Sequence, residues 1–73
     1  MTVFARVNYI GWVHLWRRRE DFESGEPSAH FFNGKTDPLW LETAGCRSEA
    51  QRAELAAGRI TEIEDPGYLI SED

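Results

Sequence analysis

Alternating apolar and polar residues near the N-terminus predict a β-strand. In the stretch VFARVNY, Val3, Ala5 and Val7 fall on one side of an extended chain and Arg6 falls on the other. The next stretch, WVHLWRR, is β-branched and aromatic and predicts a second strand, with Gly11 between the two marking a turn or a bulge. Because YIGWVHLW is apolar on both sides, we expect it to lie in the middle of a sheet.

Further segments predict short strands. AHFF and LWLE flank NGKTDP, and the pair Asn33-Gly34 favours a hairpin because both residues tolerate a positive φ. RITEIED predicts another strand, which is followed by a turn at Pro66-Gly67 into YLI. The acidic stretch EDFESGEPS is rich in turn-forming residues and predicts a connection between strands.

One helix is predicted over about residues 47–57, within TAGCRSEAQRAELAAG. Ser48 is its expected N-cap, Gln51 completes a capping box, and Gly58 ends the helix. We expect Leu55 on the charged, outward face of this helix. The opposite face is a stripe of small or apolar residues expected to pack on the sheet: Ala50, Ala53, Ala57 and Ile60.

These segments predict a single α+β domain over residues 1–73, with a small antiparallel sheet of three to five strands and the helix packed on it. A chain of 73 residues buries only about 60% of the surface that it exposes when unfolded. Its large apolar residues are therefore needed for the core, and little remains to line a deep pocket. We expect Trp12, Trp16 and Trp40 to dominate this core, or the seam of a homodimer; the sequence leaves both a monomer and a homodimer open.

The cysteine content and the N-terminus favour a cytoplasmic protein. Cys46 is the only cysteine, so the fold cannot depend on an internal disulfide, and a reducing compartment suits it. The N-terminus lacks the basic and then apolar profile of a signal peptide, and no run of 18 apolar residues predicts a membrane span.

The stretch AHFFNGKT satisfies a relaxed phosphate-loop pattern, with Ala29 in place of the first glycine. A phosphate loop needs a flexible backbone that wraps the phosphates and a helix that begins at Gly-Lys-Thr. Here two phenylalanines occupy the loop, and the following residues read as a strand. We therefore interpret the stretch as a turn and expect no nucleotide or other cofactor.

Two other kinds of chemical site are considered. His14, His30 and Cys46 are spaced too widely for a compact zinc site, which needs close pairs of ligands. Cys46 as a catalytic nucleophile would need an electropositive surrounding and an orienting third group, for which so small a domain offers little scaffold. We expect no metal site, no catalytic residues and no enzymatic activity.

The charge is distributed unevenly along the chain. Residues 1–19 contain four arginines and no acid, whereas residues 20–73 contain 13 acids against four bases, giving charges of +4 and −9. Arg17, Arg18 and Arg19 follow two tryptophans, and such a combination can bind single-stranded nucleic acid. This gives an alternative function, a small regulatory or nucleic-acid-associated domain that uses these arginines with Trp12 and Trp16. The acidic excess that follows disfavours direct nucleic-acid binding.

Two acidic clusters predict a different partner. Glu62, Glu64 and Asp65 lie beside Tyr68 and Leu69, and a second cluster lies just after the arginines, at Glu20, Asp21 and Glu23. Such a surface would attract a basic protein surface and compete there with nucleic acid. The alternative is that these acids have no binding role and only keep the protein soluble.

In its overall character, the chain resembles the small phage-encoded inhibitors of bacterial defence, including anti-CRISPR proteins. The resemblance covers the length, the acidity and the predicted α+β fold, and it includes no motif, so it implies no site residues. Several such inhibitors occupy the DNA-binding surface of a Cas effector. The sequence therefore predicts a non-enzymatic inhibitor or binding protein whose acidic, DNA-like surface blocks a basic nucleic-acid-binding partner, such as a Cas effector complex.

Overall fold

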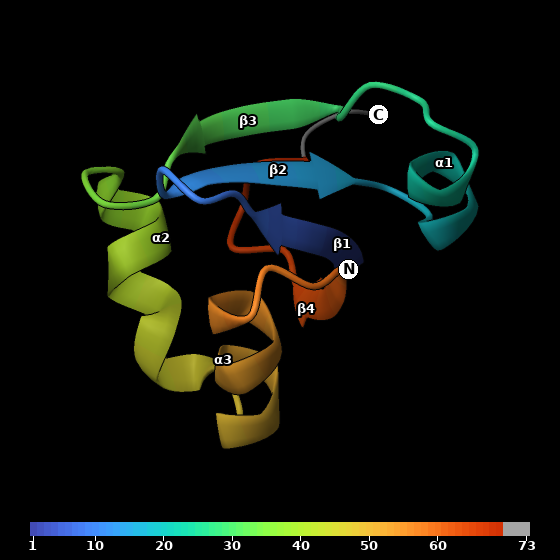
Figure 1. Ribbon diagram of the computed structural model, residues 1–73. Coiled ribbons are helices and arrows are strands. Elements are labelled where there is room, and N and C mark those ends of the chain that lie inside the picture. Colours follow the sequence, from blue (N-terminus) through green and yellow to red (C-terminus); the bar gives the residue numbers. More distant parts are fainter. Residues whose placement is uncertain (70–73) are drawn as a thin grey trace.

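The computed structural model describes residues 1–69, which form a four-stranded antiparallel sheet with short helices (Figure 1). The sheet has the order β3-β2-β1-β4, and all three neighbouring pairs are antiparallel. This confirms the predicted α+β class with a small antiparallel sheet. In chain order the elements are β1 (Thr2–Val7), β2 (Trp12–Trp16), α1 (Arg19–Glu23), β3 (His30–Asn33), α2 (Pro38–Thr43), the 3-10 turn η1 (Ala44–Cys46), α3 (Glu49–Ala56) and β4 (Thr61–Glu64).

The first two strands pair as an antiparallel hairpin, so of the two alternatives left open at Gly11, a turn or a bulge, the structure has a turn. Asn8 organises the turn, because its side-chain Oδ1 accepts hydrogen bonds from the backbone N–H groups of Ile10 (3.1 Å) and Trp12 (2.9 Å). Gly11 has a φ of +90°, a conformation that other residues rarely adopt. Successive side chains of β1 and β2 point to opposite faces of the sheet, and this places one side of each strand against the core.

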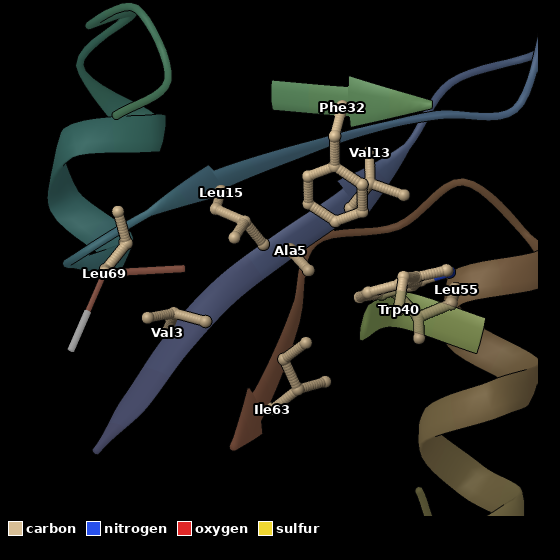
Figure 2. Close-up of a cluster of buried hydrophobic side chains, with 9 residues drawn as sticks. All are labelled: Val3, Ala5, Val13, Leu15, Phe32, Trp40, Leu55, Ile63 and Leu69. Carbon is tan, nitrogen blue, oxygen red and sulfur yellow. The ribbon is translucent and has the colours of Figure 1, made fainter. Parts of the chain in front are cut away.

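The core lies between one face of the sheet and the helices α2 and α3, which Figure 1 shows on the same side of the sheet. Figure 2 shows the buried side chains that converge there. The Trp40 ring of α2 reaches Phe32 of β3, with ring centroids 5.5 Å apart, and Leu55 extends into the core from α3. The buried cluster consists of Val3, Ala5, Val13, Leu15, Phe32, Trp40, Leu55, Ile63 and Leu69.

The predicted strand LWLE is wrong, because this segment forms α2. The helix begins with Pro38, and the Asp37 carboxylate caps it by accepting hydrogen bonds from the backbone N–H groups of Leu39 (3.1 Å) and Trp40 (3.3 Å). An aspartate followed by proline is a typical helix start, and this signal, together with the high helix propensity of the two leucines, prevails over the β propensity of the tryptophan.

The predicted hairpin at Asn33-Gly34 is also wrong. The chain does turn here, with the N–H of Asp37 donating to the carbonyl of Asn33 (3.0 Å), but it leads into α2. Gly34 does not have a positive φ. It is required for a different reason: an added Cβ would lie 2.7 Å from Val13 Cγ2 and 2.9 Å from the Gly11 carbonyl oxygen.

Helix α3 confirms the predicted capping box, but it faces the sheet with a different side. Ser48 Oγ accepts from the Gln51 N–H (3.1 Å), and Gln51 Oε1 accepts from the Ser48 N–H (2.8 Å). Leu55 is buried against the sheet, whereas the three predicted alanines are exposed: Ala50, Ala53 and Ala57. Leu55 is the largest apolar residue of the helix, so its burial removes more apolar area from water than the burial of any one alanine.

One other expectation needs correction, because part of the acidic stretch predicted as a connection forms the short helix α1. After β4 the chain bends at residues 67–69, where a turn at Pro66-Gly67 into YLI was predicted. Ile70 of that stretch lies outside the described residues. Within residues 1–69, the structure contains no helix with the length and apolar character needed to cross a membrane.

Candidate binding surface

The face of the sheet opposite the core carries most of the aromatic side chains that the core does not use. The strand registers place His14 of β2 between Phe31 of β3 and Arg6 of β1. They also place Trp16 of β2 beside Phe4 of β1. Among the described helices, only α1 contacts this side, at the end of β2. We call this surface the open face, and it consists of Phe4, Arg6, Trp12, His14, Trp16 and Phe31.

The rings of the open face contact one another in series. Phe31 stacks on His14, with centroids 5.7 Å apart, and lies 6.0 Å from Trp12. His14 lies 6.1 Å from Trp16, and Trp16 meets Phe22 of α1 edge-on at 5.0 Å. Phe31 is 58% exposed. A shift of the β3 register by one residue would have placed it in the core instead of Phe32. A large aromatic side chain at such exposure is available to a partner.

The loop between α1 and β3 folds over one end of the open face and leaves a shallow cavity. Trp16 Nε1 donates to the carbonyl of Glu26 (2.9 Å), and this bond together with α1 buries the Trp16 ring. Ser28 Oγ lies 3.0 Å from His14 Nδ1. The cavity has a volume of about 440 Å³ and lies between the loop and the side chains of Arg6, His14 and Phe31.

Charged groups surround the open face at its β1 and β4 side. The Arg6 side chain donates from Nε to the Gly58 carbonyl (2.9 Å), and the Arg19 guanidinium lies 5.9 Å above the centre of the Phe4 ring. Glu62 of β4 is directly across from Phe4, and Glu64 forms an exposed ion pair with the N-terminal amine (2.7 Å). The perimeter therefore carries both signs of charge.

The first predicted acidic cluster is only partly at the surface. Glu62 and Glu64 are exposed, but Asp65 is only 8% exposed. The Asp65 carboxylate accepts hydrogen bonds from the backbone N–H groups of Gly67 (3.0 Å), Tyr68 (2.8 Å) and Leu69 (2.7 Å). It therefore holds the turn that follows β4 and does not belong to a contact surface.

Tyr68 and Leu69, predicted as apolar anchors beside these acids, belong to the interior. Leu69 is 1% exposed and lies in the core. The Tyr68 ring stacks on Phe32 at 4.2 Å, and its hydroxyl donates to the Asp37 carboxylate. This hydrogen bond is the main cause that lowers the pKa of Asp37, while burial is the main cause that raises the pKa of Tyr68.

The second acidic cluster lies on α1, next to the arginines. Glu20 and Glu23 are exposed, whereas Asp21 pairs with Arg18 at 2.9 Å. Arg17 is exposed at the end of β2, and Arg19 is directed over Phe4. Of the predicted alternative surface, Trp12 is half-buried on the open face and Trp16 is buried beneath α1.

Phe4, Arg6, His14 and Phe31 were not predicted to belong to a binding surface. For the two residues of β1, the signal was present, because they alternate with the core residues of that strand. The position of Phe31 could not be read in this way, because HFF is apolar in both of its phenylalanines and only the pairing with β2 decides which one faces outward.

The three residues considered as zinc ligands lie in different places. His14 is on the open face, His30 stacks on Tyr68 (5.2 Å), and Cys46 is exposed in η1. Across residues 1–69, no group of three or more His, Cys, Asp or Glu side chains is arranged to hold a metal ion. At the phosphate-loop pattern, the helix begins after Gly-Lys-Thr, and the Asp37 carboxylate occupies its N-terminus, where a phosphate would otherwise bind.

Comparison with models of protein families, with curated proteins and with solved structures gives no significant match for this chain. The chemistry of its own surface is therefore the basis for assigning a role.

Proposed function

We propose that this protein is a non-enzymatic binding protein whose open face contacts a basic surface of another protein and blocks it. The open face itself carries this proposal. Its rings contact one another, Phe31 at its edge is 58% exposed, and within residues 1–69 α1 is the only helix that packs on it. Aromatic residues and arginine are enriched at the energetic centres of protein interfaces, surrounded by a polar rim.

Charge favours a basic partner. The chain has a net charge of −5. The two acidic clusters also approach the same end of the open face: Glu62 is across from Phe4 in the sheet, and α1, which carries Glu20 and Glu23, reaches Phe4 through Arg19. Acids on this rim would steer a basic surface toward the aromatic centre and raise the association rate.

The one arrangement on this face that resembles catalytic machinery is the contact between His14 and Ser28. A nucleophilic serine needs a base that is oriented by a further group, together with donors for the oxyanion. Within residues 1–69, no carboxylate accepts a hydrogen bond from the His14 ring. The contact therefore supports a role in holding the loop on the sheet.

A DNA-competing inhibitor, such as an inhibitor of a Cas effector, is the specific form of this role that we propose. A basic groove that binds nucleic acid offers the complementary charge, and bases stack in such grooves on apolar surfaces that an aromatic patch could also occupy. Occupation of the groove by this protein would then exclude the nucleic acid.

Single-stranded nucleic acid as a direct ligand is a second candidate. The observation that favours it is the row formed by Phe31, His14 and Arg6 across three strands, because stacked rings beside a guanidinium can hold bases and phosphates. The net charge of −5 and the exposed Glu62 and Glu64 oppose it. We therefore place it after the protein partner.

The test is charge reversal on the rim. The double variant Glu62→Lys, Glu64→Lys should bind a captured basic partner more slowly, and wild-type binding should weaken as salt rises. Glu42→Lys, an exposed change on α2, is the matched control and should bind normally. DNA should displace the wild-type protein from its partner. Simultaneous binding of DNA and this protein would contradict the blocking role, and direct binding of an oligothymidylate at physiological salt would favour the second candidate.

A further inference from the structure

A second cavity lies away from the aromatic centre of the open face, at the β4 edge of the sheet. It has a volume of about 570 Å³. On the helical side it is lined by Thr43, Cys46, Arg47 and Gln51, and on the sheet side by residues of β4 and the turn that follows. Its distinguishing feature is a buried cation.

Arg47 is only 8% exposed, and its guanidinium is held in a fixed position. The guanidinium carbon lies 3.5 Å from the centre of the Trp40 ring, and Nη2 donates to Thr43 Oγ1 (3.2 Å). Thr43 is itself fixed, because its hydroxyl donates to the carbonyl of Leu39 (3.1 Å). The planar group is thus oriented before any ligand arrives.

This cation has no carboxylate partner among residues 1–69. Three carboxylates line the cavity, and none of them pairs with the guanidinium. Asp65 accepts three backbone N–H groups, Glu64 pairs with the N-terminal amine, and Glu62 is exposed. Burial is the main cause that lowers the pKa of Arg47, as expected for a charge that is removed from water. Charged side chains that are buried in this way are normally paired.

The unused donors of Arg47 reach the cavity. Its bond to Thr43 is the one hydrogen bond that the guanidinium donates within the described part of the chain. In this same part, no fully buried side-chain nitrogen or oxygen lacks a hydrogen-bond partner. The remaining guanidinium N–H groups are therefore open to solvent, and Arg47 lines the cavity.

We propose that this cavity binds the carboxylate of a small monoanionic molecule through the guanidinium of Arg47. A planar guanidinium matches a carboxylate with two parallel hydrogen bonds, and a guanidinium that is already oriented loses less entropy on binding. Glu62 lines the same cavity and is exposed, so it repels a ligand with additional negative charge. This favours a monocarboxylate over phosphate.

The test follows thermal unfolding in acetate, phosphate and chloride at constant ionic strength and pH. A ligand that binds only the folded protein raises its melting temperature with concentration. Because phosphate also stabilises folded proteins without binding at a site, the quantity to compare is the part of each rise that Arg47→Lys removes. Arg47→Lys keeps the charge but loses the planar pair of donors, so it should remove most of the acetate rise and little of the rise in phosphate or chloride. The matched control Arg59→Gln changes an exposed arginine paired with Glu54 and should keep the acetate rise. An unchanged acetate rise in Arg47→Lys, or an equal or larger part removed in phosphate or chloride, would overturn the proposal.

A titration of the wild-type protein keeps the proposal testable if the variant does not fold. In NMR spectra, acetate should shift the indole N–H signal of Trp40 and the backbone amides of Cys46 and Arg47 in a saturable manner, because these groups adjoin the guanidinium. Saturable shifts elsewhere, or none, would refute the site.

Discussion

Phe31 stacks on His14 across the β2–β3 pair, with ring centroids 5.7 Å apart, on the side of the sheet away from α2 and α3. A phenylalanine that is 58% exposed contributes little to the core, so its contacts suit recognition better than folding. The contact between these two rings joins β3 to the centre of the open face, so this surface is continuous over three strands.

Replacing Phe31 should therefore separate binding from stability. We expect Phe31→Ser to change the free energy of unfolding by less than about 1 kcal/mol, because most of the ring is already in water. Loss of an aromatic residue at an interface centre should weaken partner binding by about 2 kcal/mol. Urea denaturation measures the first quantity, and a binding titration measures the second. A loss of stability of several kcal/mol would show that the ring supports the fold.

The close approach at Gly34 predicts a steric sensitivity that does not depend on φ. Gly34→Ala should lower the free energy of unfolding by about 1–3 kcal/mol, the usual cost of overpacking, because its Cβ would contact Val13 Cγ2 at 2.7 Å. Gly45→Ala is the matched control, since nothing lies within 4 Å of its Cβ position. Equal stability of the two glycine variants would contradict the predicted contact.

We also expect Lys35→Ala to leave the stability of the protein nearly unchanged.

The capping box of α3 predicts a measurable contribution from Ser48. Ser48→Ala removes the hydroxyl that accepts from the Gln51 N–H, and it should reduce the free energy of unfolding by about 1 kcal/mol. Chemical denaturation of this variant beside Ala50→Ser, a change at an exposed position of the same helix, gives the comparison. If Ser48→Ala is as stable as the wild type, the cap does not stabilise α3.

The contact between Tyr68 and Asp37 predicts a dependence of stability on pH. The hydrogen bond from Tyr68 is the largest of the causes that lower the pKa of Asp37 below its ordinary value of 3.8. A carboxyl group with a lowered pKa in the folded state stabilises the protein above its unfolded pKa, and this stabilisation is lost as the pH falls through the folded pKa. The loss should therefore occur below about pH 4.

Tyr68→Phe should reduce this loss, because it removes the donor that stabilises the Asp37 carboxylate. The measurement compares the free energy of unfolding at pH 7 and pH 3 for the wild type, Tyr68→Phe and Tyr9→Phe. Tyr9 is 98% exposed, so its variant should behave as the wild type. If all three proteins lose the same stability between the two pH values, Tyr68 does not set the pKa of Asp37.

The sequence was sufficient to predict elements with strong local signals. β1 and β4 follow from their alternating residues, and β2 follows from its β-branched and aromatic residues. The start of α3 follows from Ser48 and Gln51. α2 was missed because the short apolar run around Trp40 was taken for a strand, although Asp37-Pro38 marks a helix start and the leucines favour a helix. The buried side of α3 was predicted wrongly because the helix has apolar residues on two faces, the alanines on one and Leu55 on the other. Only the packing against the sheet decides which face is buried.

The binding surface was harder to predict because it is assembled from several strands. Trp12 and Trp16 stood out by residue type, but their contacts with Phe31 and Phe22 depend on the strand register and on the position of α1. Asp65 was misplaced for a related reason. Its charge resembles that of its exposed neighbours, and only the backbone turn after β4 shows that the carboxylate is used internally.

Asp65 should tolerate reversal of its charge much less well than its exposed neighbours. Glu62 and Glu64 can be changed to lysine with little effect on folding, because exposed charges contribute little to stability. Adding Asp65→Lys should lower the free energy of unfolding by several kcal/mol, since three backbone N–H groups lose their acceptor and a cation enters a buried position. Thermal unfolding of the double and triple variants makes the comparison, and equal melting temperatures would show that Asp65 is dispensable.

The most direct test of the proposed role compares partner capture by Phe31→Ser with capture by Leu41→Ser. Leu41 is 51% exposed on α2, so the second variant makes a similar surface change away from the open face. Wild-type protein and both variants are immobilised, exposed to the same bacterial lysate, and the bound proteins are quantified. We expect a basic nucleic-acid-binding protein to be retained by the wild type and by Leu41→Ser and lost by Phe31→Ser. Equal capture by Phe31→Ser, or loss with Leu41→Ser instead, would contradict binding through the open face.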